Sequence, residues 1–339
     1  MIHLGDGRWI IIDSCLDTES GEPAALCYLA HIGVDPASVS HVIATHWHDD
    51  HVGGLSRVVE ACANATFCCA AALTSTEFLN LVTVFNKRTI AITTGLSEIE
   101  KVLYLLMQRR VQPRYVLGDM PLPATSSAPE ARVTALSPVN AEFVRFIQSL
   151  ARHVPTDLTT KHRFPRPDEN DISIAALLMV GNACALLGAD LETTTSSNRG
   201  WNAVLASTNR PAAIGSLFKV PHHGSETGHH PDVWTGLLDP QPVAILTPWN
   251  RGSKLPTRDD RKRISSFAER SFITATETTS VSRQANYAVE KTIRESKITV
   301  SAAESRTGRI TARIPFAAQA GGFQWSIDIS PEASDLNYY

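Results

Sequence analysis

The sequence predicts an α/β protein whose sheets are covered by helices. Short apolar runs rich in β-branched residues alternate along the chain with segments of helical periodicity, which is typical of this class. Apolar residues make up 43% of the 339 residues and charged residues 19%, so the chain can bury a large core. These values exclude a disordered or collagen-like chain, and the length corresponds to one large domain or two ordinary ones.

The first half is expected to alternate between buried strands and helices. The strands are short apolar runs bounded by glycine or polar residues, and the helices follow from periodicity and from breaks at glycine. The expected order is strand 8–13, helix 21–33, strand 41–45, helix 53–63, strand 65–70, a mostly helical insertion over 73–111, a loop rich in Pro, Ser and Ala over 119–132, strand 132–136 and helix 140–150.

The second half contains an apolar hairpin and several strands that end in polar motifs. Gly181 and Asn182 form the expected tight turn between strands 172–180 and 183–187. A polar, proline-broken loop over 153–171 precedes them, and long loops of this kind often form the walls of a site. The remaining elements are expected as helix 192–207, strands 215–220 and 243–246, a helix after residue 257, strand 272–275, a polar helix near 280–295, and strand-like runs over 309–314 and 323–329.

Net charge and cysteine content restrict the environment and the partners. The formal net charge is -3 and the pI is about 6.5, so there is no global basic field and any nucleic-acid contact must be local. Six cysteines beside apolar runs, with no CxxC pair, indicate reduced core residues. The start lacks the features of a signal peptide, and no apolar run approaches the ~20 residues of a membrane span. We therefore expect a cytoplasmic protein with no membrane partner.

Polar residues that follow the expected strands supply the chemistry. Ligands of α/β proteins gather at the C-terminal ends of strands, where the loops of several strands meet. The densest group contains His46, His48, Asp50 and His51, directly after a buried strand. Two imidazoles two residues apart point to one side of an extended segment, and the following Asp and His can turn toward a second point nearby. One short run can therefore bind two metal ions.

A histidine-rich surface turn is the alternative interpretation of this run. Four candidate ligands within six residues, placed between a buried strand and a Gly-Gly pair, favour a metal site. Asp49 fits better as a spacing residue or as a residue behind the ligands, and Trp47 as a packing residue. Other strand-end positions hold Asp13, Asp190 and the pair His222-His223.

The segment THWHDDHVGG over 45–54 resembles the HxHxDH motif of the metallo-β-lactamase-fold hydrolases. Further landmarks follow: Asp13 resembles the family's early structural aspartate, Asp190 in LLGAD its bridging aspartate, and KVPHHGS over 219–225 its last ligand histidine with a neighbour. Together with the segment Asn170-Asp-Ile-Ser173, these motifs are most similar to the nuclease-like domain of the competence channel ComEC and its free-standing relatives. The resemblance covers roughly residues 1–280.

This resemblance implies a metallo-β-lactamase-like αββα sandwich, with two mixed β-sheets flanked by helices and a helical insertion over 73–111. It implies a single domain over 1–339, in which C-terminal strands within 300–339 complete or flank the second sheet. It also implies one or two divalent metal ions, Zn or Mn, as cofactors.

The resemblance further assigns ligands to both ions. His46 and His48 would bind the first ion, Asp50 and His51 would bind the second, and Asp190 would bridge them. The adjacent pair supplies the last ligand of the second ion: we favour His223, with His222 facing substrate, over the reverse assignment. The implied roles are catalysis for Asp50 and His222, substrate binding for His222, Ser225 and Lys254, and support for Asp13, Asn170 and Ser173.

The sequence departs from the family pattern at the first ion. Most two-metal members have a further His between the HxHxDH run and the bridging Asp, whereas the matching segment here, 170–173, has none. His153 and His162, in the long loop, are candidate substitutes. Lys254 stands where ComEC relatives often have Gly-His-Pro, and it could contact phosphate or be a solvated loop residue.

Three functions are compatible with this site. We favour a phosphodiesterase or nuclease that uses a metal-bridged hydroxide on nucleic acid or another phosphodiester, with a protein partner or a homo-oligomer left open. The second function is hydrolysis of another ester, such as a phosphorylcholine-type ester, a lactone or a thioester. The third is a non-enzymatic module with a structural metal, which an intact ligand set disfavours.

A basic cluster follows the last site strand. It could flank a nucleic-acid groove, or it could form a solvated helix face in which Asp259 and Asp260 are interleaved. Its members are Arg251, Lys254, Arg258, Arg261, Lys262 and Arg263.

Overall fold

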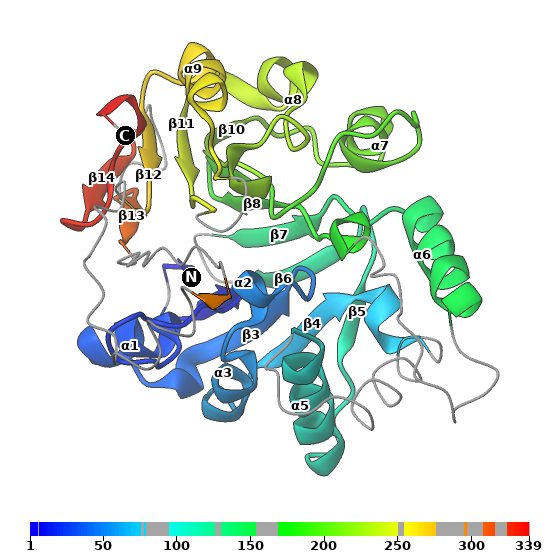
Figure 1. The fold of residues 1–339 in the computed structure, drawn as a ribbon. Helices are drawn as coiled ribbons and strands as arrows, with labels where there is room; N and C mark the ends of the chain where they lie inside the picture. Colours follow the sequence, from blue (N-terminus) through cyan, green and yellow to red (C-terminus); the bar gives the residue numbers. More distant parts are fainter. Residues whose placement is uncertain are drawn as a thin grey trace.

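Two β-sheets pack face to face, and helices cover the outer face of each sheet (Figure 1). The expected α/β sandwich is therefore confirmed. The computed structural model describes residues 1–5, 7–75, 78, 95–125, 130–153, 169–249, 254–275, 295–296, 308–315 and 324–338.

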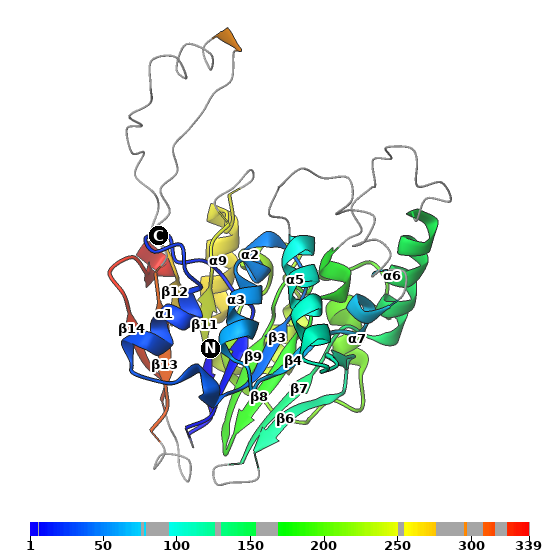
Figure 2. The ribbon, with the colours of Figure 1, turned by 90° about the horizontal axis from the view of Figure 1, so that it is seen from below.

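The first sheet has five strands in the order β1 (Ile2–His3), β2 (Trp9–Ile12), β3 (Val39–Ala44), β4 (Thr66–Ala70) and β5 (Arg114–Val116). β2 to β5 run parallel, and parallel neighbours need crossover connections. The helices α1 (Ala24–His31), α3 (Leu55–Ala61) and α5 (Gly95–Gln108) lie in these connections and on the outer face (Figures 1 and 2).

Only part of the expected helical insertion over 73–111 is described. Its described helix, α5, packs against α3 and buries Ile99, Val102 and Leu106 in the main core. Residues 79–94 lie outside the described residues, as does most of the polar helix expected near 280–295.

The second sheet has eight strands in the order β15-β12-β11-β10-β9-β8-β7-β6. β9 to β12 run parallel, and β6 to β9 run antiparallel. Val180 pairs with Ala183, so the hairpin expected at Gly181 and Asn182 is confirmed. The bounds are β6 (Pro121–Thr125), β7 (Ala131–Ala135), β8 (Ala176–Val180), β9 (Ala183–Leu187), β10 (Gly215–Lys219), β11 (Leu238–Leu246), β12 (Ser271–Ile273) and β15 (Ser334–Asp335).

Side-chain alternation along the strands divides the core into two layers. On β10, Leu217 belongs to the main core between the sheets, whereas Phe218 faces the outer cluster. That outer cluster also takes Trp201, Trp234 and Ile264, so helices cover this face as well. The helices are α7 (Gly200–Ala206), α8 (Pro231–Gly236) and α9 (Arg258–Phe267), while α6 (Asn140–His153) lies beside the sheets (Figure 1).

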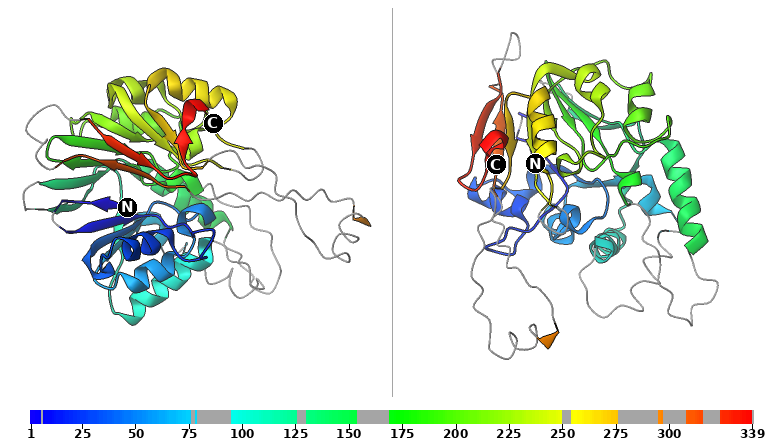
Figure 3. Two further views of the ribbon diagram at one scale, coloured as in Figure 1. Left: turned by 90° about the vertical axis from the view of Figure 1, so that its left-hand side faces the viewer. Right: turned by 45° about the horizontal axis from the view of Figure 1, so that its top comes forward.

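The C-terminal strands behave in two ways. β15 pairs with β12 and extends the second sheet, whereas β13 (Ile310–Arg313) and β14 (Ser326–Ile329) pair with each other as a separate ribbon. Trp325 beside β14 donates its indole N–H to Ser216 Oγ (3.0 Å), and Arg309 lies over the Tyr28 ring of α1. The ribbon thus lies along the edge shared by both layers (Figure 3).

Residues 119–132 are not a loop throughout, so that expectation was wrong. Pro121–Thr125 form β6, which pairs with β7 at the edge of the second sheet. An edge strand tolerates proline because one side of its backbone has no ladder partner. The sequence shows that the prolines of this segment lack an N–H donor. It does not show that the segment lies at the edge of the sheet, where that N–H is not needed.

The helix expected over 192–207 is also wrong in its first half. The helix α7 begins only at Gly200, because hydroxyl side chains before it bond the local backbone. Ser196 N donates to Thr194 Oγ1 (3.2 Å), and the Asn202 amide donates to Thr194 O (2.7 Å).

The cysteines differ from the expectation at two positions. All six are free; four are buried, but Cys15 is exposed and Cys27 half-buried. Among the helices of the described residues, none combines the length and the apolar character that crossing a bilayer requires.

Candidate metal centre

The candidate site lies where parallel strands of both sheets end. Asp13 follows β2 and Thr45 follows β3 in the first sheet, whereas Asp190 follows β9 and His222 follows β10 in the second. Polar groups from both sheets meet there because parallel strands place their C-terminal ends at one edge. The short helix α2 (Asp49–Val52) carries Asp50 and His51 at this edge (Figure 1).

Six side chains form two groups of three donors. Within each group, one donor atom per residue lies within 4.8 Å of the others. The first group is His46, His48 and Asp190, and the second is Asp50, His51 and His223.

Asp190 connects the two groups. Its Oδ1 lies 3.2 Å from Nε2 of His51, and its Oδ2 lies 3.8 Å from Nε2 of both His46 and His223. The Asp190 side chain is only 4% exposed, so this carboxylate is held inside the protein between imidazoles. The geometry is that of a carboxylate able to serve two neighbouring ions.

In each of the four imidazoles, the nitrogen that points away from the donor group is hydrogen-bonded to an oxygen. That oxygen can act only as an acceptor, either by its chemistry or because its own proton is already donated elsewhere. His51 Nδ1 lies 2.7 Å from Asp13 Oδ2, and His223 Nδ1 lies 3.0 Å from the Thr247 carbonyl oxygen. His48 Nε2 lies 2.6 Å from Glu169 Oε2. These nitrogens must carry the proton in the neutral ring, so the other nitrogen of each ring keeps its lone pair.

His46 follows the same rule through a hydroxyl. Thr45 Oγ1 donates its proton to Asp13 Oδ2 (2.8 Å), and it is therefore left to accept from His46 Nδ1 (3.0 Å). The lone pair of His46 Nε2 then points at Nδ1 of His48, 3.0 Å away. Two nitrogen lone pairs at this distance require a proton or a cation between them.

The backbone at these positions is shaped to aim the donors. Asp13 has φ of 58°, and its carboxylate also accepts the Thr45 N–H (2.7 Å), which ties the ends of β2 and β3 together. His222 and His223 have φ of 47° and 55°, a left-handed conformation that is uncommon outside glycine. Such strained residues persist where the surrounding structure holds them, and they concentrate at functional sites.

The charge pattern of the centre favours a cation. Burial opposes protonation of His51, but the carboxylates of Asp190 and Asp13 raise its pKa well above the ordinary value. Burial likewise opposes ionisation of Asp190, yet His51, His46 and His223 hold its pKa well below the usual range. Burial and the His51 charge lower the pKa of His46, which remains a neutral donor.

The two most exposed donors mark the open side of the centre. The His48 side chain is 36% exposed and Asp50 is 29% exposed, whereas His46 is fully buried. Burial lowers the pKa of His48, but the Glu169 carboxylate raises it by more. The pKa of His48 therefore lies above its ordinary value. A substrate can therefore approach from the side of His48 and Asp50.

His222 is not part of either donor group. Its Nδ1 lies 2.7 Å from Glu192 Oε1 and 3.0 Å from Thr227 Oγ1. Ser225 is buried, and its hydroxyl contacts the same imidazole nitrogen (3.1 Å). Of the two adjacent histidines, His223 is therefore the one placed among the donors, and catalysis or substrate binding by His222 and Ser225 stays a prediction.

Asn170 and Ser173 lie behind the centre, in and after the short helix η3 (Glu169–Ile172). Ser173 Oγ accepts the backbone N–H of Asp190 (3.0 Å) and so holds the connecting carboxylate in place. Asn170 donates to Glu192 Oε1 (3.4 Å), and its buried Oδ1 has no hydrogen-bond partner among the described residues. Lys254 is exposed, and the side chains of His153 and His162 lie outside the description.

The neighbours of the donor run have structural roles. Trp47 is buried against Phe78 and Phe146, as expected for a packing residue. Asp49 accepts the backbone N–H of Gly95 and so caps the start of α5.

Sequence reasoning missed four groups at this site. Glu169 contacts His48, the Thr247 carbonyl contacts His223, and Glu192 contacts His222. Lys219 lies half-buried at the end of β10, where desolvation lowers its pKa although the carboxylates of Asp190, Asp13 and Asp50 act to raise it. A signal existed only for Lys219 and Glu192, which stand close to recognised motifs; Glu169 stands beside Asn170 in a segment without a histidine.

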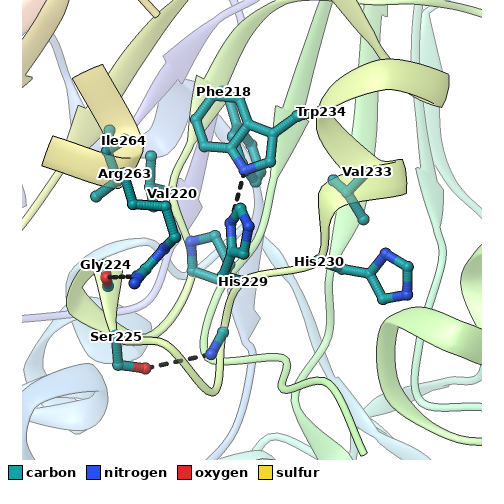
Figure 4. A pocket seen from close by; sticks show the side chains of 12 residues that line it. Phe218, Val220, Gly224, Ser225, His229, His230, Val233, Trp234, Arg263 and Ile264 are labelled. Carbon is teal, nitrogen blue, oxygen red and sulfur yellow. Dashed lines mark hydrogen bonds between the residues drawn. The ribbon is translucent and has the colours of Figure 1, made fainter. Parts of the chain in front are cut away.

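A small cavity lies behind the turn that carries His223 (Figure 4). The Arg263 side chain donates to the Gly224 carbonyl oxygen (2.8 Å), and Trp234 Nε1 donates to His229 Nδ1 (3.1 Å). With about 10 Å³ of free space, the cavity has room for about one water. It supports the turn and is too small for a substrate.

The donor set fits divalent metal ions. Each group offers two imidazole nitrogens and one carboxylate, which are ligands that Zn²⁺ accepts and that other first-row metals such as Mn²⁺ also use. The facing lone pairs of His46 and His48 require a proton or a cation between them, and a divalent ion bound to both nitrogens would meet this requirement.

Residues 1–83 match the family model described as the metallo-beta-lactamase superfamily. This match and the two-sheet architecture support the metallo-β-lactamase superfamily fold. No curated protein matches the sequence.

Several solved structures are similar at low identity. They include Zn²⁺-bound PqqB from Methylobacterium extorquens (12% identity, 57% of this chain and 53% of that chain, TM-score 0.28). MEM-A1, a subclass B3 metallo-beta-lactamase isolated from a soil metagenome library, gives 13% identity, 59% and 65% coverage, and a TM-score of 0.29. The metallo-beta-lactamase fold protein YhfI from Bacillus subtilis has 12% identity, covers 79% of this chain and 84% of that chain, and gives a TM-score of 0.34. This chain thus spans less than two thirds of the length of PqqB and of MEM-A1.

Proposed function

We propose that this protein is a metal-dependent hydrolase and, within that class, a phosphodiesterase whose substrate is nucleic acid. The observation that carries the proposal is the set of four imidazoles, each with a lone pair available to a metal ion. They belong to two neighbouring donor groups, which Asp190 connects. Such a paired site is the arrangement used for in-line displacement at phosphorus.

The residues of the chain divide the work in the proposed reaction. His46, His48 and Asp190 would hold one ion, and Asp50, His51 and His223 would hold the other, with Asp190 shared. Bound ions would supply Lewis-acid polarisation and an activated water. Asp50, at the open side, would orient that water, because its partly exposed carboxylate can accept a hydrogen bond from it.

Phosphodiesters are favoured over other esters by the sequence motifs around the site. The segments KVPHHGS and Asn170-Asp-Ile-Ser173, with no further histidine, resemble the ComEC-type branch. The imidazole of His222, held by Glu192, would face a phosphate oxygen, and Lys254 would add positive charge at the rim. The reaction would run in the cytoplasm, with Zn or Mn as the metal.

The test is cleavage of single-stranded DNA, double-stranded DNA, RNA and bis(p-nitrophenyl) phosphate by protein loaded with Mn²⁺ or Zn²⁺. The expected result is metal-dependent cleavage that Asp50→Ala abolishes. Asp232→Ala, at an exposed carboxylate of α8, is the matched control and should cleave as the wild type does.

Other outcomes would redirect the assignment. Intact phosphodiesters beside turnover of a lactone, a thioester or a phosphorylcholine-type ester would establish the second function. Full biological function in Asp50→Ala would indicate a structural metal.

A further inference from the structure

We propose that the outer face of α9 is a docking surface for the phosphate backbone of a nucleic-acid strand. The proposal rests on the proposed function, because it names where the polymer substrate would lie outside the metal centre. The face, which we call the α9 surface, comprises Arg258, Arg261, Lys262, Ser265 and Ser266.

The α9 surface lines one side of an open depression. The spacing i, i+3, i+4, i+7 and i+8 places its five residues on a single face of the helix. The depression has a volume of about 490 Å³ and is completed by Leu336 and Asn337 of η6 (Leu336–Tyr338). Apart from Leu336, its lining is made of cations, hydroxyls and one amide, which are groups that bind phosphate oxygens.

The basic cluster of the sequence separates into two sets on this helix. Arg263 belongs to the inner side, where it is paired with Asp260 (2.7 Å) and bonded to the Gly224 carbonyl oxygen. Asp260 is buried and closes the capping box with Thr257. Of the two acids interleaved in the cluster, Asp260 therefore caps the start of the helix and pairs with Arg263 on the inner side.

The outer side of α9 carries more cations than acids from the helix itself. Asp259 is the only acid of α9 on the solvent side; it is 92% exposed and lies 3.6 Å from Lys262. Within α9, one solvent-side carboxylate therefore accompanies the cations Arg258 and Lys262. Exposed pairs of this kind are weak and give way to competing anions.

Helix stability does not account for these cations. Arg258 and Arg261 lie in the first turns of α9, where the partial positive charge of the helix N-terminus disfavours cations. The first turn also carries Asp259 and Asp260, which suit the helix N-terminus, whereas the two arginines do not. The placement instead creates a positive region in which the side chains and the helix terminus act together on an anion.

The chain connects this face to the metal centre over a short path. The Trp249 ring packs against the ring of His223 (5.5 Å between centroids), and Trp249 exchanges two backbone hydrogen bonds with Leu255 (2.8 and 2.9 Å). Arg258 stands three residues after Leu255, a span of at most about 11 Å. A strand held at the centre therefore has this surface within reach.

A nucleic acid fits the α9 surface better than an anionic membrane does. Membrane-surface helices combine cations with apolar residues that enter the bilayer. The one apolar residue of the depression, Leu336, is 1% exposed and belongs to the core. The surface offers charge and hydrogen bonds but nothing to insert into lipid.

The test measures binding of a labelled, hydrolysis-resistant phosphorothioate strand to metal-loaded full-length protein by fluorescence anisotropy. The variant is Arg258→Glu with Lys262→Glu. The matched control is Lys101→Glu with Arg132→Glu, because it makes the same change in charge on another face and Lys101 has its own i, i+3 partner, Glu98. Hydrolysis of bis(p-nitrophenyl) phosphate is measured on the same samples.

We expect the α9 variant to lose tenfold or more in affinity for the strand while its hydrolysis of the small substrate stays at the wild-type level. The slope of log K against log salt should fall by about two between about 50 and 200 mM, roughly one for each cation removed. The control pair should keep both affinity and slope close to wild type.

Three results would overturn the α9 surface. They are unchanged affinity in the α9 variant, equal losses in both pairs, and binding only to vesicles of anionic lipid. Hydrolysis of the small phosphodiester is measured independently of strand binding in each case. Loss of binding without loss of hydrolysis would therefore count against neither the metal centre nor the proposed function, whereas absence of hydrolysis in the wild type would count against the proposed function.

Discussion

The Nε2 atom of His223 lies 3.2 Å from Oδ2 of Asp50. Asp50 belongs to α2, which follows a strand of the first sheet, and His223 belongs to the turn after β10 of the second sheet. The second donor group therefore exists only when the two sheets are packed together. Metal binding and folding should be coupled for this reason.

Removal of metal should lower the thermal stability of the wild-type protein. An ion that binds only the folded chain adds about 2.7 kcal/mol to the free energy of unfolding at a free concentration about 100 times its Kd. We expect a lower midpoint of thermal unfolding after chelation and its recovery on adding Zn²⁺ or Mn²⁺. A midpoint that does not respond to metal would contradict the coupling.

The adjacent histidines should differ in their effect on metal content. His223→Ala removes a donor of the second group and should reduce the affinity for one ion by more than about 100-fold, beyond the range typical of residues behind the ligands. His222→Ala removes a side chain bound to Glu192 and should leave the metal content unchanged. Elemental analysis after dialysis measures both, and the reverse pattern would assign the ligand to His222.

Glu169 should influence metal affinity without being a ligand. Its carboxylate accepts from Nε2 of His48 and so keeps Nδ1 available toward His46. Glu169→Gln keeps the shape but removes the charge, and we expect a loss of about 10- to 100-fold in affinity for the first ion. Isothermal titration with Zn²⁺ measures this loss, and the control is Glu22→Gln, at an exposed carboxylate that pairs with Arg57 and belongs to neither donor group.

Mild acid should weaken the fold through His229. Burial and then the Arg263 charge lower the pKa of His229 from 6.5 to about 4, so the ring is neutral in the folded state. The unfolded chain takes up a proton below pH 6.5 and the folded chain does not, so this contribution to stability is present above 6.5 and is lost as the pH falls toward about 4. The loss should reach roughly 1–2 kcal/mol, since the half-buried ring is partly screened by solvent.

Urea unfolding at about pH 7 and about pH 5 measures this effect. His229→Gln keeps an acceptor for Trp234 Nε1 but cannot titrate, so it should reduce the pH dependence of the unfolding free energy. An equal dependence in wild type and variant would show that His229 takes up its proton over the same pH range in the folded and the unfolded chain.

Gly200 should not tolerate a side chain. It has φ of +56°, and an added Cβ would lie 2.0 Å from the Glu192 carbonyl oxygen. Its N–H also donates to the buried carboxylate of Glu142 (2.6 Å). We expect Gly200→Ala to lower the free energy of unfolding by about 2–4 kcal/mol.

Gly236 is the matched control for this change. It ends α8 and has open space around the position of a Cβ, so Gly236→Ala should remain within about 0.5 kcal/mol of wild type. A similar loss in both variants would show that the helix ends, and not the contact with Glu192, control stability.

Local patterns were sufficient for the elements whose signal is continuous in the sequence. The strands before the donor residues are apolar stretches that end at Ile12 and at Ala44, and a polar residue follows each of them. The start of α7 and the edge strand β6 were misjudged, because hydroxyl bonds to backbone and edge positions depend on neighbours outside the local window.

By itself, the sequence determined the sandwich and the chemistry of its donor residues, because periodicity and the spacing of imidazoles and carboxylates are local properties of a chain. Only the tertiary structure decided which nitrogen of each histidine is free. That depends on Asp13, Glu169 and Thr247, which approach from other strands and helices. It also places His223 beside Asp50 and His222 beside Glu192, because two adjacent residues with left-handed backbone point to different partners, and no spacing in the sequence records that direction.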